Sequence, residues 1–256
     1  MIAIEFRLKI SSAYSIRVPY SYQCARTYPL PAPSTIKGLC ANALWRAEGG
    51  NPMDILNKIH NASLGATSRS EYSIEVSSCT ERVIPMNALL RQFAFTPYID
   101  CLIAFKEDNE SLVEKIADAL ENSPLYLGDS ESLVCVMPGS INCITSQDRV
   151  KKVSEGDRVE INSLFKFDFV KNNSITEKGV VLYMQEDPCS PEAVLDRYIA
   201  PLKQRGDSYT PIESFSFIVS KKCFVFEGKR LKGIFCEPMK EESTKQKTKR
   251  TRKKKT

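Results

Sequence analysis

The 256-residue sequence contains one histidine, His60, and one tryptophan, and it lacks long apolar runs. Histidine is the commonest general acid–base residue and a frequent zinc ligand, so a single imidazole argues against histidine-based acid–base cleavage and against a zinc site. No apolar stretch approaches the ~20 residues that a membrane-spanning helix needs. The start, MIAIEFRLKI, is too short and too charged for a signal peptide. We therefore expect a cytoplasmic protein with no membrane partner.

The sequence also lacks the short motifs of metal, redox and nucleotide sites. None of its nine cysteines forms a C-x-x-C pair, and the phosphate-binding loop G-x-x-x-x-G-K-[ST] is absent. Most cysteines lie in apolar segments such as LVCVM and KGIFCE. Because their number is odd and no export signal is visible, we expect reduced, mostly buried thiols. These patterns predict no metal, no cofactor and no catalytic residues.

Positive charge is concentrated at the C-terminal end. The last 17 residues, KEESTKQKTKRTRKKKT, hold nine Lys or Arg and two Glu, a net charge of +7; subtracting this from the whole-chain +5 leaves −2 for residues 1–239. Without aliphatic or aromatic residues, 240–256 is predicted to be a disordered basic tail. Such a tail either keeps the protein soluble or attracts phosphates without reading sequence. Any specific nucleic-acid site on the near-neutral body must be a local patch.

Apolar periodicity in residues 1–145 predicts the order β-α-β-β-α-β. Alternation in IAIEFRLKI predicts a half-buried strand, and helical spacing predicts helices at about 34–48, from Pro52 and in ESLVEKIADALEN. Three further strands are expected, at 71–79, 100–106 and 133–137. This order is that of the ferredoxin-like fold of RNA-recognition modules, in which helices cover one face of the sheet and the other face is free.

The chain changes character from about residue 146. Short strands are expected at GVVLYM, SFSFIVS, KCFVFEG and LKGIFCE, and also where Phe165, Phe167 and Phe169 alternate. A helix is expected at about 191–200, between two prolines. We interpret 146–239 as a mostly β subdomain. The prediction is therefore an α+β protein with an RRM-like domain at 1–145, this subdomain and the basic tail.

A stiff, proline-rich segment precedes the first helix. In RTYPLPAPSTIKGLC (26–40), the prolines restrict the backbone to extended geometry. Ser34 or Thr35 is expected to cap the helix. Lys37 lies in the first turn, where the helix dipole disfavours a cation unless an anion binds there. Lys37 taken alone is more simply a solvated side chain.

Tyrosines and arginines are interleaved between residues 14 and 28. Aromatic rings stack on unpaired bases while guanidinium groups bind phosphates, so this composition suits single-stranded RNA. Any one of these tyrosines is more simply a packing residue. Their concentration beside the helix start favours an RNA-binding surface that includes Arg17, Tyr22, Arg26 and Tyr28.

Four stretches resemble the CRISPR-associated Cas-five family: RTYPLPAPSTIKGLCANAL (26–44), LLRQFAF (89–95), YLGDSESLV (126–134) and TPIESFSFIVSKKCFVFEGKRLKGIF (210–235). Members of this family are RAMP (repeat-associated mysterious protein) subunits that cap the 5′ end of the guide RNA in type I Cascade complexes. The first stretch is similar to the family pattern P-P-P-[ST]-x-x-G, with Ala32 at the middle proline position. The C-terminal glycine-rich loop is represented only by Gly228 and Gly233, which leaves subtypes I-A, I-D and I-B open.

The resemblance implies a non-catalytic prokaryotic subunit for antiviral defence that binds the repeat-derived 5′ handle of crRNA. The insertion at about 80–98 would be a thumb that reaches toward the first backbone RAMP subunit. The large subunit would dock nearby, which makes target DNA an indirect partner. The candidate RNA-binding residues are Arg17, Tyr22, Arg26, Tyr28, Ser34, Thr35, Lys37, Arg91 and Phe93.

Two other functions stay open at this point. A RAMP endoribonuclease that processes precursor crRNA would need a base near the RNA, and only His60 and generic lysines or tyrosines are available. A stand-alone RNA-binding protein would leave the apolar segment MNALLRQFAF exposed without a partner.

Overall fold

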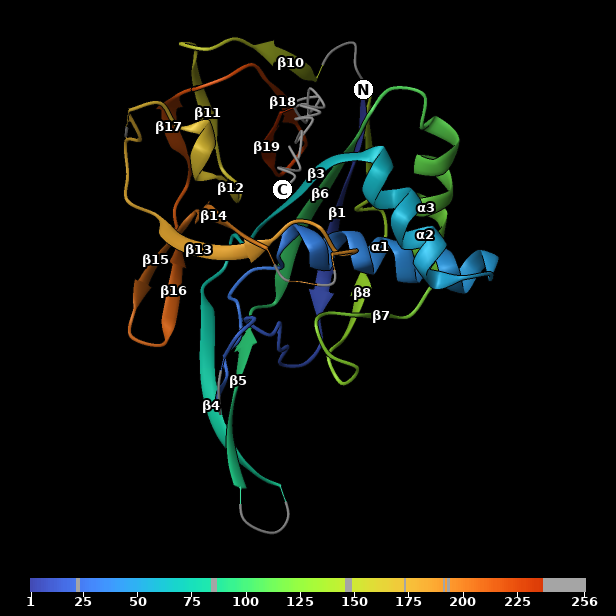
Figure 1. The fold of residues 1–256 in the computed structure, drawn as a ribbon, viewed down its shortest axis with the longest axis vertical. Helices are drawn as coiled ribbons and strands as arrows, with labels where there is room; N and C mark the ends of the chain where they lie inside the picture. Colours follow the sequence, from blue (N-terminus) through green and yellow to red (C-terminus); the bar gives the residue numbers. More distant parts are fainter. Residues whose placement is uncertain are drawn as a thin grey trace, which may run out of the picture.

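The computed structural model describes residues 1–21, 24–83, 87–145, 149–172, 174–190, 192 and 194–236. Its first half is built on an antiparallel sheet with the order β3-β6-β1-β8-β7, in which β9 pairs with the start of β1 (Figure 1). The strands of this sheet are β1 (Ile2–Ile10), β3 (Ser63–Arg69), β6 (Tyr98–Phe105), β7 (Leu125–Tyr126), β8 (Leu133–Val136) and β9 (Asn142–Thr145). The helices are α1 (Pro33–Glu48), α2 (Pro52–Ala62) and α3 (Glu110–Asn122).

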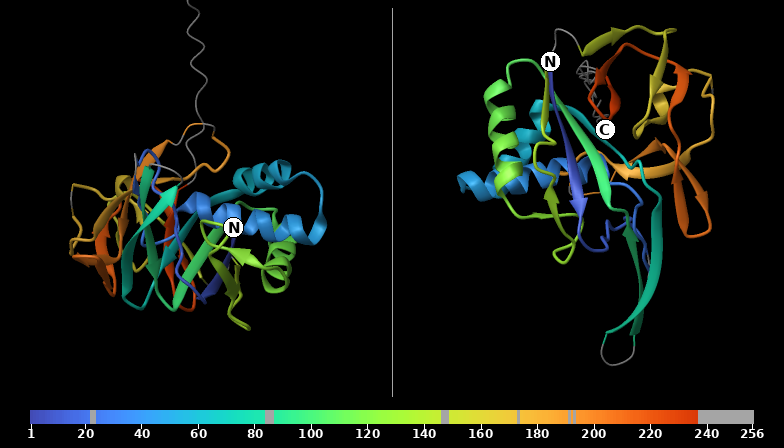
Figure 2. Two further views of the ribbon diagram at one scale, coloured as in Figure 1. Left: turned by 90° about the horizontal axis from the view of Figure 1, so that it is seen from below. Right: turned by 180° about the vertical axis from the view of Figure 1, so that it is seen from behind.

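Helices α1 and α3 cover one face of this sheet, and α2 packs on α1 (Figure 2). Alternate residues of β1, such as Ile4 and Phe6, are buried in one apolar core with Ile36 of α1 and Ile116 of α3. The sequence β1-α1-β3-β6-α3-β8 has the predicted β-α-β-β-α-β order. The predicted α+β class is therefore confirmed.

The second strand of this order differs from the prediction. It is β3, with the sequence SLGATSR, and the segment expected at 71–79 instead begins the long strand β4 (Ile74–Val83) of another sheet. Strand β3 is buried on both faces and has mostly small residues, so it lacks the alternation that marks a half-buried strand. A side chain at Gly65 would meet Phe235, because a Cβ there would lie 2.7 Å from the Phe235 Cδ1.

Strands β4 and β5 (Asn87–Phe95) form a long antiparallel hairpin that extends away from the body (Figure 1). Strand β2 (Cys24–Ala25) pairs in parallel with the middle of β5, and β16 (Ser208–Pro211) pairs with β4 at the base of the hairpin. Strand β15 (Leu202–Arg205) completes this sheet. The hairpin is thus joined to both the segment before α1 and the second half of the chain.

The second half forms small antiparallel sheets, β10-β18-β19, β11-β17 and β12-β14-β13. Their strands are β10 (Val150–Val153), β11 (Arg158–Ile161), β12 (Phe165–Lys166), β13 (Val180–Gln185), β14 (Leu195–Ala200), β17 (Phe215–Ile218), β18 (Cys223–Glu227) and β19 (Lys232–Phe235). The helix expected at 191–200 is wrong, because Leu195–Ala200 is the central strand β14; Pro191 lies outside the described residues. The alternating phenylalanines extend only through β12, since Phe167–Phe169 forms a 3₁₀ turn.

The expectation that the second face of the central sheet is free is also wrong. Phe226, Leu231 and Phe235 pack on the small residues Ala3 and Ala104 of that face. Beside them, the fully buried carboxylate of Glu5 accepts hydrogen bonds from the backbone N–H groups of residues 229, 230 and 231 at 2.8–2.9 Å. Glu5 of β1 therefore attaches the loop before β19. The C-terminal strands cover the part of this face around Ala3 and Ala104, whereas Lys9 and its pairing partner Cys135 at the other end are exposed.

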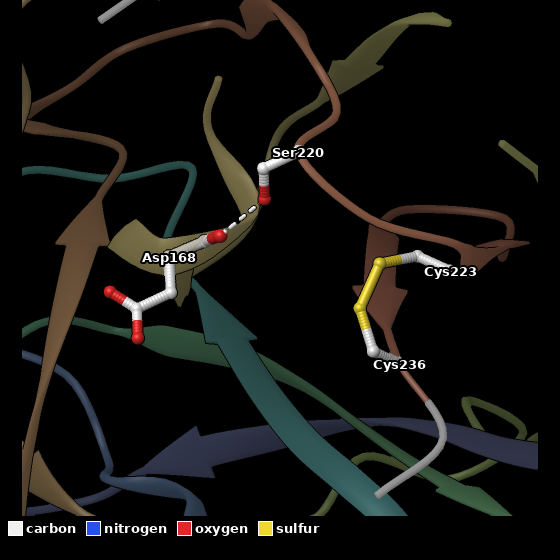
Figure 3. Close-up of a disulfide and its surroundings, with 4 residues drawn as sticks. All are labelled: Asp168, Ser220, Cys223 and Cys236. Carbon is white, nitrogen blue, oxygen red and sulfur yellow. Dashed lines mark hydrogen bonds between the residues drawn. A yellow bond between two sulfur atoms is a disulfide. The ribbon is translucent and has the colours of Figure 1, made fainter. Parts of the chain in front are cut away.

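The cysteines depart from the expected reduced, mostly buried thiols. Cys223 and Cys236 form a disulfide that joins the first residue of β18 to the residue after β19 (Figure 3). Because Phe224 pairs with Phe235, these two cysteines lie opposite each other, one position beyond the paired residues. Three other cysteines are exposed: Cys79, Cys135 and Cys143. Near the disulfide, the hydroxyl of Ser220 donates to the carbonyl of Asp168 (Figure 3).

Candidate nucleic-acid interface

The proline-rich segment is held against the body by side chains from distant elements. The Tyr14 hydroxyl donates to the carbonyl of Pro29 at 2.6 Å, and the Ser68 hydroxyl donates to that of Pro31 at 3.0 Å. Helix α1 begins at Pro33, with Ala32 as its N-cap. The prediction that Ser34 or Thr35 caps the helix is wrong, since both lie inside the first turn. Both are half-buried there.

Four predicted residues line one groove of ≈430 Å³ beside the first turns of α1: Arg17, Tyr28, Ser34 and Thr35. Sequence reasoning did not identify the other polar residues of its lining, which are Asn42, Tyr126 and Gln185. No carboxylate lines the groove within the described part of the chain. The guanidinium of Arg46 lies at its border, 5.4 Å from the centre of the Tyr126 ring, and its Nε donates to the Asn42 Oδ1 at 3.0 Å.

One signal in the sequence locates the helical side of this groove. Thr35, Gly38, Asn42 and Arg46 are spaced by three, four and four residues, so they share one face of α1. Unlike the apolar stripe that includes Leu39 and Leu44, this face of α1 carries only polar or small residues. A search for such a polar face, carried out beside the apolar one, would have identified Asn42 and Arg46.

Two glycines shape the groove. A Cβ at Gly38 would meet no heavy atom within 4 Å, so this helical position leaves open space on the groove side. Gly128 has a φ of +91°, and a Cβ there would lie 2.2 Å from the carbonyl oxygen of Ser15. The turn after β7 therefore requires glycine to approach the segment that carries Arg17.

The tyrosines of residues 14–28 divide into packing residues and exposed residues. Tyr14 is fully buried, and Tyr28 is 4% exposed, with its hydroxyl donating to the carbonyl of Tyr183. Burial raises the pKa of Tyr28 to about 12. Tyr28 thus borders the groove while most of its ring is packed in the core. Tyr20 is 75% exposed, and Tyr22 lies outside the described residues.

Lys37 does not share the groove with its neighbours Ser34 and Thr35. Its side chain is only 2% exposed, and Nζ donates to the carbonyl of Glu186 at 3.2 Å and lies 3.4 Å from the Nδ1 of His60. Burial lowers the pKa of Lys37. The expectation of a solvated lysine is wrong because β13 and α2 also pack on α1, which makes the buried side of the helix wider than its apolar stripe.

The other predicted residues lie on the hairpin or beside it. Arg26 is exposed and does not line the groove. The guanidinium of Arg91 binds the carboxylate of Asp129 and lies 4.7 Å from the centre of the Phe93 ring. Asp129 also accepts the backbone N–H of Ser132 at 2.9 Å. Arg91 and Phe93 therefore join the hairpin to the turn 128–132.

Within the residues that the structure describes, no three His, Cys, Asp or Glu side chains come together as a metal ion would require. In that same part of the chain, no helix is long and apolar enough to span a membrane.

Comparisons with known proteins agree with the resemblance described above. The sequence model described as CRISPR-associated protein (Cas_Cas5) matches residues 4–183, whereas none of the curated proteins matches the chain. The crystal structure of a CRISPR protein from Archaeoglobus fulgidus has a TM-score of 0.58 at 15% identity, covering 93% of this chain and 100% of that chain. This similarity shows a shared fold.

A chain from a CRISPR RNA-guided surveillance complex has a TM-score of 0.43 at 15% identity, covering 81% of this chain and 91% of that chain. The family assignment does not depend on this weaker similarity. It follows from the sequence match, which spans more than half of the 256 residues. The chain belongs to the CRISPR-associated protein (Cas_Cas5) family.

Proposed function

We propose that this protein is a non-catalytic subunit of a type I CRISPR effector complex that binds the 5′ handle of crRNA in the groove beside α1. The observation that carries this proposal is the convergence of Arg17, Ser34 and Thr35 on one groove without a carboxylate in the described lining. The proposal also draws on the family to which the chain belongs.

The chemistry of the groove suits an RNA backbone. The first turn of α1 has no acidic residue, and no side chain caps it, so its N–H groups and positive dipole end favour an anion. Hydroxyls of Ser34 and Thr35 add donors, and Arg17 adds a charge-assisted, bidentate contact. The exposed Arg26 extends the positive charge toward the hairpin base, where the RNA chain would continue.

We also propose that the β4–β5 hairpin docks on the first backbone RAMP subunit and that the large subunit docks nearby. Leu90 and Phe95 of β5 are 39% and 47% exposed, so this strand offers two large apolar side chains to a partner. They point to opposite faces of the hairpin, since their positions differ by an odd number of residues. Both faces would then contact other subunits.

The direct test is filter binding of a repeat-derived 5′ handle to the wild type and to the Arg17→Ala, Thr35→Ala double variant. Loss of a charge-assisted contact typically costs ~1.5–3 kcal/mol, so we expect at least a tenfold weaker affinity at moderate salt. Arg205→Ala is the matched control, because Arg205 is exposed on β15 and does not line the groove. An affinity that is equal in the double variant and the control would refute the groove as the handle site.

The competing function, an endoribonuclease that processes precursor crRNA, needs a base beside the bound RNA. His60, the one histidine of the sequence, lines a different cavity from the groove, so a handle bound in the groove would have no imidazole beside it. We expect a denaturing gel of the bound handle and of a longer precursor to show intact RNA after prolonged incubation. Shortened RNA that depends on His60 would establish the endoribonuclease instead.

A further inference from the structure

A second cavity, of ≈950 Å³, lies between α1, α2 and β3 on one side and the C-terminal strands on the other. Lys37 and His60 line it from the helices, and Lys106 lies at the end of β6. From the second half of the chain come Lys166, Lys221 and Lys222, with the apolar side chains of Phe224 and Ile234. The first turn of α1 separates this cavity from the groove, because Ser34 and Thr35 line the groove and Lys37 lines the cavity.

The carboxylates of the cavity already have cationic or imidazole partners. Glu186 and Asp196 both bind the ammonium of Lys166, the latter at 2.9 Å. Asp187 Oδ1 lies 3.4 Å from the Nε2 of His60. The cavity lining thus contains five lysines and three carboxylates, and the carboxylates are committed to one lysine and one histidine.

Of the cavity lysines other than Lys166, Lys37 is the buried one. Its contacts are neutral: the Glu186 carbonyl and the Nδ1 of His60, which accepts when the imidazole carries its proton on Nε2. Among the described residues, no carboxylate lies within ion-pair distance of Lys37. An ammonium has three donors, so one N–H remains for a ligand. The carboxylates of Glu186 and Asp187 attract Lys37 only from beyond ion-pair distance, and a bound anion would add direct compensation for its burial.

The rim of the cavity adds further positive charge. The Lys106 ammonium donates to the carbonyl of Asn61 at 2.6 Å, and that of Lys221 lies 5.1 Å from the centre of the Phe169 ring. Lys222 is exposed beside it. Neither of these two contacts neutralises a charge, so Lys106, Lys221 and Lys222 add three exposed cations to the cavity lining.

We propose that this cavity binds a nucleotide phosphate, with Lys37 as the internal donor and Lys106, Lys221 and Lys222 around it. The volume is within the range of small-molecule sites, ~300–1,000 Å³, and exceeds what a bare phosphate fills. The half-exposed Phe224 and the other apolar lining would contact the nucleoside. The phosphate comes from either a free nucleotide or an RNA strand. This inference concerns a cavity other than the handle groove and does not rest on the proposed function.

The test uses the full chain and calorimetric titration with four probes: AMP, inorganic phosphate, and one short RNA with either a 5′-phosphate or a 5′-hydroxyl. Lys37→Met removes the internal cation while keeping an unbranched side chain. Lys221→Gln with Lys222→Gln removes two rim charges. The control is Lys151→Gln with Lys152→Gln, which makes the same charge change on β10, outside the cavity lining.

We expect AMP or an RNA probe to bind to the wild type. Binding should be at least tenfold weaker in Lys37→Met and in the Lys221, Lys222 double variant, and it should change little in the control. Binding of AMP identifies a free nucleotide, preference for the 5′-phosphorylated RNA identifies a strand end, and equal binding of both RNAs identifies an internal phosphate. The proposal is overturned if no probe binds at millimolar concentration, or if inorganic phosphate binds as tightly as AMP and both RNAs. It is also overturned if Lys37→Met or the Lys221, Lys222 variant binds as the control does. The Arg17→Ala, Thr35→Ala double variant should still bind AMP while its affinity for the handle falls. Failure of one proposed site can therefore be told from failure of the other.

Discussion

Gly38 offers a test in which stability and RNA binding are expected to change in opposite directions. It occupies the interior of α1, where glycine is destabilising relative to alanine by roughly 0.5–1 kcal/mol because its backbone loses more freedom on folding. A Cβ at this position would meet no heavy atom within 4 Å. Gly38→Ala should therefore raise the free energy of unfolding by about that amount and introduce no strain.

The same position faces the handle groove, so a longer side chain would occupy space that RNA is proposed to fill. Glutamine has nearly the helix propensity of alanine, and Gly38→Gln should stabilise the fold by a similar amount. Filter binding should show little change for Gly38→Ala and at least a tenfold loss of handle affinity, or about 1.4 kcal/mol, for Gly38→Gln.

The pair of variants separates the two effects because both are made at one position and differ in size. Denaturant unfolding gives the stability and filter binding gives the affinity, under one buffer and salt concentration. A Gly38→Gln protein that binds the handle as tightly as wild type would refute the groove as the RNA site. A Gly38→Ala protein that is less stable than wild type would refute the reading of this position as open space.

Three further predictions concern other parts of the molecule. Glu5→Gln should lower the free energy of unfolding by about 2 kcal/mol or more in urea, because an amide cannot accept all of the backbone N–H groups that the buried carboxylate binds; an unchanged unfolding curve would contradict this role. Between the lowered pKa of Lys37 and its unfolded value of 10.5, the unfolded chain binds more protons than the folded protein, so stability rises with pH in this range. Lys37→Met should reduce this rise, and identical pH profiles of unfolding in the variant and the wild type would contradict the prediction. The raised pKa values of Tyr14 and Tyr28 act the same way in both proteins and cancel in this comparison. Leu90→Asp with Phe95→Asp should leave a folded protein that no longer co-purifies with the backbone subunit, as each buried apolar anchor contributes ~2 kcal/mol or more at an interface; normal co-purification would show that the hairpin docks elsewhere.

The elements that sequence reasoning predicted well are those whose signal is local. Helices α1 and α3 each pack an apolar side against a neighbour, and β1 alternates large apolar residues with polar or small ones, so helical spacing or alternation is written directly into their residues. The same kind of signal was missing from β3, which is buried on both faces, and misleading at β14, where two prolines resembled helix boundaries. For these strands, pairing with distant segments outweighed local preference.

The candidate site was predictable to the extent that it depends on composition and spacing. The composition of residues 14–28 and the helix start indicated a surface that includes Arg17, Ser34 and Thr35, and these residues do line one groove. The packing of the tyrosines was not predictable, because Tyr28 is buried through a contact with Tyr183, 155 residues away. Arg91 likewise binds Asp129 of a turn that is remote in sequence.

The sequence by itself determined the elements of the β-α-β-β-α-β order other than its second strand, the stiff segment before α1 and the family, because each depends on residues close together in the chain. Only the tertiary structure decided which surfaces remain open. The C-terminal strands cover part of the second face of the central sheet, and Glu5 becomes a buried acceptor for the loop 229–231. Lys37 is one position from the apolar stripe and faces inward only because β13 and α2 pack on that side of α1. Burial depends on segments that meet after folding, and no local pattern records it.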